Sequence, residues 1–204
     1  MKKIIVLLGI FLWFPLITWA QEKIEAPVWK VGDTWVFTQG KIKVIGADEN
    51  SYTLKFSKDT NMIETKGFDK IIFDKSTLNR IYTLKDDNRE KYTKGHRRIL
   101  NFPLKLGGEW KDTFTSQILL GPAKGSSANF SEAFKVVGWE DVKVKAGDFK
   151  TIKLEYTQAL GTKFSGKAIY WYAPEVKYFV KCIYDKSYFV GLADWELVSF
   201  KLKK

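Results

Sequence analysis

The amino-acid sequence predicts an all-β protein built as an antiparallel curled sheet, either barrel-like or arranged as a sandwich. Two observations support this prediction. Apolar and polar residues alternate with a period of two over several short runs, which is typical of strands with one buried and one solvated face. Turn residues separate these runs about every 8–12 residues, as in sandwiches and barrels. No stretch has a convincing 3.6-residue period, so at most one short helix is expected in the connections.

The first half of the chain contains a clear hairpin. Ile42 and Val44 alternate with lysines, Gly46–Ser51 has the composition of a turn, and apolar residues alternate again from Tyr52 to Phe56. Further strands are expected at Met62–Thr65, Lys70–Asp74 and Leu78–Leu84. The charged segment Lys85–Lys91 is interpreted as a solvated loop, and Gly121–Ser127 as a mobile loop.

The second half contains another hairpin and the closing strand. Val142 and Val144 lead into the turn Ala146–Asp148, in which Gly147 can take a positive φ, and alternation resumes at Ile152. The last strand is expected at Trp195–Leu202.

Three successive aromatic residues, Tyr170–Tyr172, form one strand end, which Pro174 follows. Because side chains alternate between the faces of a strand, Tyr170 and Tyr172 share one face and Trp171 takes the other. The face of the two tyrosines is expected to continue into Tyr178.

Two similar segments divide the chain into halves. Trp29–Phe37 and Leu104–Phe114 both read as an aliphatic residue, glycine, an acid, tryptophan and an aromatic residue. Their spacing of about 75 residues is too long for a solenoid repeat, and fits two sheets or two halves of one curled sheet.

A family resemblance covers residues 102–181. The segment from Gly138 reads GWEDVKVKAGDFKTIK, the segment from Tyr170 reads YWYAPEVKYFVK, and Phe102–Trp110 reads FPLKLGGEW. As a set, these motifs resemble secreted bacterial proteins grouped as domain of unknown function 3108 and its TapB-like relatives. The resemblance implies an extracytoplasmic β-rich domain and carries over no catalytic residues.

Residues 1–20 have the order of a secretory signal peptide: two lysines, an apolar run from Ile4 to Trp19, and small residues at the end, with Thr18 and Ala20 at the −3 and −1 positions. Cleavage after Ala20 would leave residues 21–204 as one secreted β-rich domain without a membrane span. No cysteine lies near this position, so the protein is expected to be periplasmic or extracellular and not a lipoprotein.

The formal charge of the chain is +11, and removal of Lys2 and Lys3 leaves +9. A basic surface attracts nucleic acid, anionic lipid or anionic envelope polymers, and export makes nucleic acid an unexpected partner. Lysines on the solvated faces of strands, such as Lys41, Lys43 and Lys143, also prevent pairing between sheet edges.

The sequence offers no set of residues for catalysis or metal binding. His96 and Cys182 are the only residues of their types, which is too few for a tetrahedral zinc site, and no orienting carboxylate lies near His96 in sequence. Adjacent acids such as Glu140–Asp141 would point to opposite faces of a strand, so no pair for glycoside hydrolysis is evident. We therefore expect neither enzymatic activity nor a cofactor.

Aromatic residues make up 16% of the chain. Tryptophan needs a partner for its N–H group, so several of these rings are expected at the margins of the core or around a concavity. The predicted ligand contacts are Tyr170, Tyr172, Tyr178, Trp110 and Trp139.

Two functions remain open. One is a non-enzymatic module that binds an apolar or amphiphilic envelope ligand, such as a lipid. The other is a structural domain with a filled core that meets a protein or polysaccharide of the cell envelope. An open cavity distinguishes the first from the second.

Overall fold

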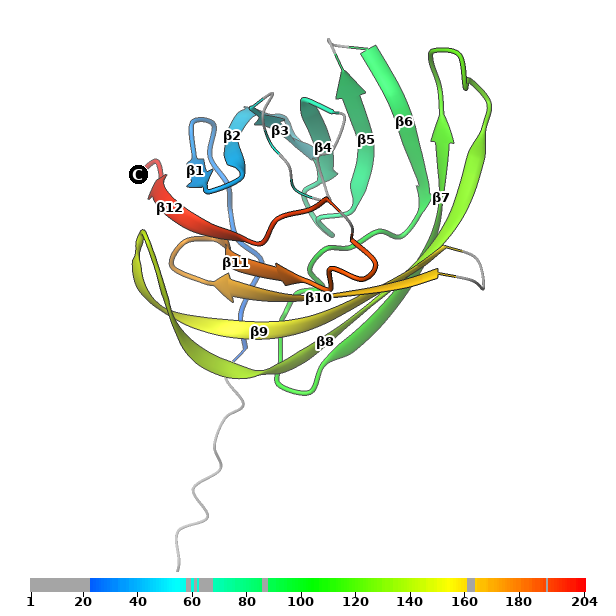
Figure 1. The fold of residues 1–204 in the computed structure, drawn as a ribbon. Helices are drawn as coiled ribbons and strands as arrows, with labels where there is room; N and C mark the ends of the chain where they lie inside the picture. Colours follow the sequence, from blue (N-terminus) through cyan, green and yellow to red (C-terminus); the bar gives the residue numbers. More distant parts are fainter. Residues whose placement is uncertain are drawn as a thin grey trace, which may run out of the picture.

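The computed structural model describes residues 23–57, 60, 62, 68–85, 88–160, 164–189 and 191–204. These residues form twelve antiparallel strands in one closed barrel (Figure 1), which confirms the all-β prediction and selects the barrel over the sandwich. The strands are β1 (Thr34–Phe37), β2 (Gly40–Ala47), β3 (Ser51–Phe56), β4 (Lys70–Asp74), β5 (Arg80–Lys85), β6 (Asn88–Gly95), β7 (Glu109–Ile118), β8 (Ser127–Val144), β9 (Gly147–Leu160), β10 (Phe164–Ala173), β11 (Tyr178–Tyr184) and β12 (Trp195–Lys201).

The strands follow one another around the barrel in chain order. Each pairs with the next, and β1 also pairs with β12, with Trp35 opposite Phe200. The carboxylate of Asp33 strengthens this closure because it accepts hydrogen bonds from the backbone N–H groups of Lys30, at 2.8 Å, and of Lys203, at 2.7 Å. The segment just before β1 is therefore joined to the segment just after β12 at the seam of the barrel.

Both predicted hairpins are present. β2 and β3 meet around Gly46–Ser51, and β8 and β9 meet at the turn before Gly147, whose φ is 138°. β8 and β9 are the long curved strands in Figure 1, and a bulge between Val136 and Gly138 interrupts their register. A bulge of this kind increases the local twist and lets long strands bend around a barrel.

One predicted loop is wrong. Most of Lys85–Lys91 belongs to strands, because β5 continues to Lys85 and β6 begins at Asn88. The sequence of β6 lacks apolar alternation because the lumen is polar here, and Lys91 and Thr93 face inward. The expected signal peptide at residues 1–20 and most of the expected strand Met62–Thr65 lie outside the described residues. Within the described ranges, no helix is long and apolar enough to span a membrane.

The stretch ahead of the first half-segment contacts the start of the second. Ile24, ahead of β1, and Leu104, ahead of β7, exchange two backbone hydrogen bonds of 3.1 and 2.9 Å. Trp35 and Trp110 each point inward and donate their indole N–H to a backbone carbonyl, of Val176 and Arg98 respectively. The two half-segments themselves lead into different parts of the barrel, since β1 pairs with β2 and β12 whereas β7 pairs with β6 and β8.

Candidate ligand-binding site

Packed aromatic rings fill one half of the barrel lumen. Tyr170 packs on Phe179 with ring centroids 5.0 Å apart, and Tyr178 packs on Trp35 at the same distance. Tyr170, Tyr172 and Tyr178 are all buried, with at most 8% of each residue exposed. The space that remains near Tyr178 is about 10 Å³, barely the size needed for one water molecule. Three of the predicted ligand contacts are therefore part of the core.

The other two predicted contacts lie elsewhere. Trp110 stacks on Phe134 with centroids 5.0 Å apart and planes 12° apart. Trp139 is half-buried on β8, and the ammonium of Lys150 lies 4.5 Å from its ring centroid. The structure brings neither of them together with the tyrosines around a common cavity.

The cavity in the other half of the lumen is polar. It measures about 200 Å³ and is lined by strands β5 to β9, together with one residue before β4 and one residue after β6. Inward-facing residues of neighbouring strands form its lining, since every second side chain of a strand points into the barrel. The lining residues are Phe68, Arg80, Thr83, Lys91, Thr93, Arg97, Phe114, Ser116, Phe130 and Gln158.

A buried carboxylate organises one side of this cavity. Glu132 accepts hydrogen bonds from Arg97, with N–O distances of 3.0 and 3.3 Å, from the hydroxyl of Tyr156 at 2.9 Å and from the amide of Gln158 at 2.9 Å. Burial acts to raise the pKa of Glu132. The charge and hydrogen bonds of Arg97, the Tyr156 hydroxyl and the charge of Arg80 outweigh it, so that the pKa lies below its ordinary value. Glu132 is therefore a carboxylate at neutral pH.

Aromatic rings form the apolar side of the cavity. Phe114 and Phe130 stack with centroids 5.2 Å apart and planes 13° apart, and the guanidinium of Arg97 lies 4.7 Å from the ring centroid of Phe114. The ammonium of Lys91 lies 5.1 Å from the ring centroid of Phe68. Cationic and aromatic side chains thus lie next to one another around the lumenal cavity.

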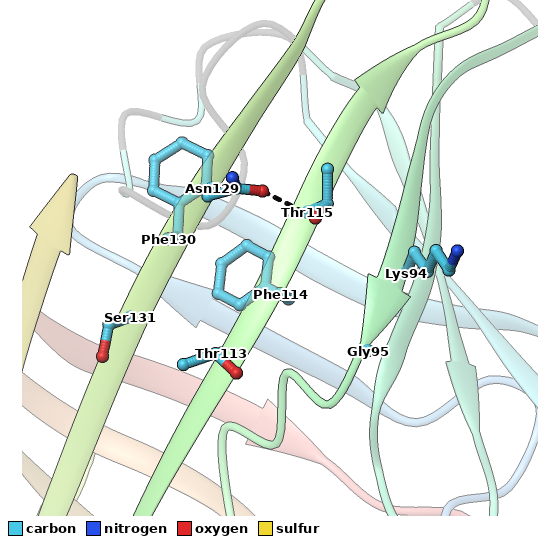
Figure 2. A pocket seen from close by; sticks show the side chains of 8 residues that line it. All are labelled: Lys94, Gly95, Thr113, Phe114, Thr115, Asn129, Phe130 and Ser131. Carbon is cyan, nitrogen blue, oxygen red and sulfur yellow. Dashed lines mark hydrogen bonds between the residues drawn. The ribbon is translucent and has the colours of Figure 1, made fainter. Parts of the chain in front are cut away.

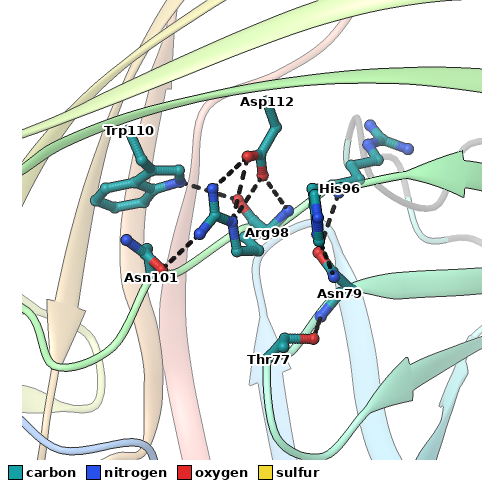
Figure 3. Close-up of polar contacts among 8 residues, drawn as sticks. Thr77, Asn79, His96, Arg98, Asn101, Trp110 and Asp112 are labelled. Atoms are coloured by element: carbon teal, nitrogen blue, oxygen red, sulfur yellow. Dashed lines mark hydrogen bonds and ion pairs between the residues drawn. The ribbon is translucent and has the colours of Figure 1, made fainter.

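A second buried carboxylate fixes the segment that carries Arg97 (Figure 3). Asp112, on β7, accepts hydrogen bonds from the backbone N–H of Arg98 at 2.7 Å and from its guanidinium at 2.6 and 3.2 Å. The guanidinium of Arg98 also donates to Asn101, and Asn79 contacts both His96 and the backbone of Arg97. We term Arg98 and Asp112 the crossing clamp, because they hold the chain where it crosses from β6 to β7.

A wider depression of about 490 Å³ lies over β6, β7 and β8, on the face opposite the lumen (Figure 2). Its outward side chains are short and polar, and the hydroxyl of Thr115 donates to Asn129 at 2.7 Å. Lys94 is its one charged residue. Phe114 and Phe130 line it as well, so it differs from the lumenal cavity mainly in offering a ligand less charge.

Sequence reasoning did not identify the residues of the lumenal cavity. No sequence pattern marks Arg97 as a site residue, and Lys91 lies in a segment whose charged composition is typical of a loop. One signal was available, because Glu132 shares its strand face with Phe130 and Phe134 and therefore had to be buried. In the part of the chain that the structure describes, no three His, Cys, Asp or Glu residues form a group that could hold a metal ion.

One solved structure supports the fold. No protein-family model matches the chain, and no curated protein matches it in sequence. The resemblance to domain of unknown function 3108 therefore stays an expectation. A candidate exported protein with a YmcC-like fold from Bacteroides fragilis NCTC 9343 has a similar structure, with a TM-score of 0.52 and 16% identity over 88% of this chain and 99% of that chain. The hypothetical lipoprotein YmcC from Escherichia coli K12 matches with a TM-score of 0.44 and 10% identity over 84% of this chain and 83% of that chain.

Proposed function

We propose that this protein is an exported, non-catalytic binding protein of the cell envelope that holds part of an amphiphilic ligand in its lumenal cavity. The observation that carries the proposal is the contrast between the two halves of the lumen. Rings fill one half, whereas the other half keeps about 200 Å³ between cationic side chains and stacked phenylalanines. Ligand pockets commonly measure about 300–1,000 Å³, so this cavity suits a headgroup or a short chain more than a whole lipid.

Two observations support export. Residues 1–20 have the charged, apolar and small-residue regions of a signal peptide. The Bacteroides fragilis protein of similar fold is described as a candidate exported protein. A bacterial lipoprotein is cleaved directly before a cysteine. The only cysteine of this sequence is Cys182, so no cysteine follows Ala20.

The contacts of the buried carboxylates support a binding role without catalysis. Glu132 accepts hydrogen bonds from three side chains, and Asp112 is held by the backbone and guanidinium of Arg98. A general base must reach a proton of the substrate. Carboxylates that are already engaged in this way stabilise the wall of the cavity instead.

The alternative is a structural envelope domain, and the filled aromatic half of the lumen favours it. Native mass spectrometry of the protein purified from its own envelope distinguishes the two functions. We expect a bound molecule on the parent protein and its loss in Ser116→Phe, which places a ring in the cavity. The matched control is Gln117→Phe, which places the same ring on the exposed face of β7 and should keep the molecule. A parent protein that carries no bound molecule, and takes none from a lipid extract, would favour the structural domain.

A further inference from the structure

We infer that the outer face of strands β12, β1, β2 and β3 docks on an anionic lipid bilayer. Four exposed lysines make the contact, and we term them the lysine patch: Lys41, Lys43, Lys55 and Lys201. Ile42, Val44 and Leu54 are fully buried in the core, so the lysines next to them in β2 and β3 point outward. The patch lies on the other side of the barrel wall from the lumen, and the inference therefore does not depend on a ligand in the cavity.

The register of the barrel places three of these lysines in one row across the strands. Lys43 lies directly opposite Lys55 on β3, and on its other side it lies opposite Thr34 on β1. Thr34 in turn lies opposite Lys201 on β12. Because neighbouring strands are about 4.8 Å apart, the row holds three charges within about 15 Å. Lys41 adds a fourth charge two residues along β2 on the same face.

The fold itself does not explain this row. Lysine protects the unpaired edge of a sheet, but β2 is paired with β1 and β3, and β3 is paired with β2 and β4. Like charges directly opposite each other destabilise a pair of strands, as Lys43 and Lys55 do here. Their separation is shorter than the screening length of about 8 Å at physiological salt. An anionic partner would relieve this repulsion.

Outward lysines on the far side of the barrel are instead matched by carboxylates. Lys135 lies opposite both Glu109 and Glu155, and its ammonium is 2.9 Å from Glu109. In β12, β1, β2 and β3 the one acidic residue is Glu196, and it pairs with Lys145 outside the patch. Within the described ranges, no residue forms an ion pair with a lysine of the patch. The patch therefore offers positive charge to a partner.

Exposed aliphatic side chains beside the lysines favour a bilayer over a soluble polyanion. Ile45 follows Lys43 along β2, and Val198 precedes Lys201 on β12, and both aliphatic side chains are exposed. A soluble polyanion gains from the charges alone, whereas the headgroup region of an anionic membrane accepts ammonium groups and aliphatic side chains together. The patch also extends both across the strands and along β2, as a planar array of headgroups does.

Sedimentation of the purified protein with lipid vesicles tests the inference. One kind of vesicle contains phosphatidylcholine alone, and the other contains phosphatidylcholine and phosphatidylglycerol in a ratio of two to one. The test variant is the double replacement Lys43→Gln and Lys55→Gln. The matched control is Lys135→Gln and Lys153→Gln, which removes the same charge from the far side of the barrel, where both lysines pair with carboxylates.

We expect the parent protein to bind the vesicles that contain phosphatidylglycerol and not those of phosphatidylcholine alone. Each lysine near an anionic surface strengthens binding about fivefold, so the test variant should bind at least tenfold more weakly. The control should stay within about threefold of the parent, because its lysines are away from the docking face. The thermal unfolding midpoint of the test variant should equal or exceed that of the parent, since a repulsion between β2 and β3 is removed.

Several results would overturn the inference. Absence of binding, or equal binding to both kinds of vesicle, would reject an anionic bilayer as the partner. An equal loss in the two double variants would indicate attraction by net charge instead of by the lysine patch. Binding to immobilised dextran sulfate that requires Lys43 and Lys55, without binding to vesicles, would assign the patch to a soluble polyanion. A lower unfolding midpoint in the test variant would show that the two lysines stabilise the fold. None of these results concerns the lumenal ligand, which Ser116→Phe tests separately.

Discussion

Arg97 and Glu132 form a two-point ion pair inside the barrel, although 35 residues separate them along the chain. The pair joins the segment after β6 to the inner face of β8, and the same carboxylate binds Tyr156 and Gln158 on β9. Three parts of the barrel wall are thereby fixed around one charge. The network thus fixes one side of the cavity with polar side chains.

Replacement of Glu132 by Gln should destabilise the protein by about 3 kcal/mol at neutral pH, because it leaves the charge of Arg97 without its counter-ion. The difference should shrink in acid. The pKa of Glu132 is lowered in the folded state, so its contribution is present above the ordinary glutamate pKa of 4.5 and is lost as the pH falls through the folded value. Urea unfolding of both proteins at about pH 7 and about pH 3 measures this. A difference that is equal at both pH values would contradict the assignment.

The crossing clamp should contribute to stability as a buried pair does. Asp112→Ala leaves the backbone N–H and the guanidinium of Arg98 without their acceptor, and we expect a loss of about 3–5 kcal/mol. The matched control is Glu109→Gln on the same strand, which removes an exposed pair with Lys135 and should cost less than about 1 kcal/mol. Chemical denaturation measures both. Equal losses in the two variants would mean that the clamp is no stronger than a surface pair.

The fold was predictable where the lumen is apolar. The alternation around Gly46–Ser51 and Ala146–Asp148 predicted two hairpins because one face of each strand enters a hydrophobic core. Apolar alternation did not predict β6, because Lys91 and Thr93 face inward there and the outward residues are polar as well. A strand that is polar on both faces cannot be distinguished from a loop by its sequence pattern, although it pairs with both neighbouring strands of the barrel.

The candidate site was less predictable for the same reason. The tyrosines were expected to line a concavity because they share one strand face in an aromatic-rich chain. In the structure these rings pack on other rings, as Tyr170 does on Phe179. The cavity lies where charged residues enter the lumen from strands that are distant in sequence. Only the register of the closed barrel brings Arg97, Lys91 and Glu132 together, and a single sequence does not give that register.

Trp171 faces the outside of the barrel, opposite Tyr170 and Tyr172, as predicted. It is 5% exposed and lies between two lysines, with the ammonium groups of Lys153 and Lys181 at 5.6 and 5.3 Å from its ring. Trp171→Ala should cost about 3–5 kcal/mol as a large truncation. Trp171→Phe should cost less than about 1 kcal/mol, because the buried indole N–H has no partner within the protein to lose. Denaturation curves of the two variants test this, and an unchanged Trp171→Ala protein would mean that the ring is not packed.

Gly166 should not tolerate a larger side chain. A Cβ atom at this position would contact the ring of Tyr188 and approach Phe189 to 2.6 Å, so Gly166→Ala should destabilise the protein by about 1–3 kcal/mol. The control is Gly138→Ala, where a Cβ atom meets nothing within 4 Å, and we expect no loss there. Thermal unfolding compares the two. A neutral Gly166→Ala variant would indicate that Tyr188 and Phe189 do not rest on β10.

The most direct test of the proposed binding function is the location of a bound ligand. Backbone amide chemical shifts, recorded by nuclear magnetic resonance during a titration with octanoate, report it residue by residue. If the lumenal cavity is the site, the largest changes occur at Thr83, Thr93, Ser116 and Gln158, which line it on four different strands. Changes that centre on Tyr170, Tyr172 and Tyr178, or on the outer depression around Thr115 and Asn129, would contradict the account.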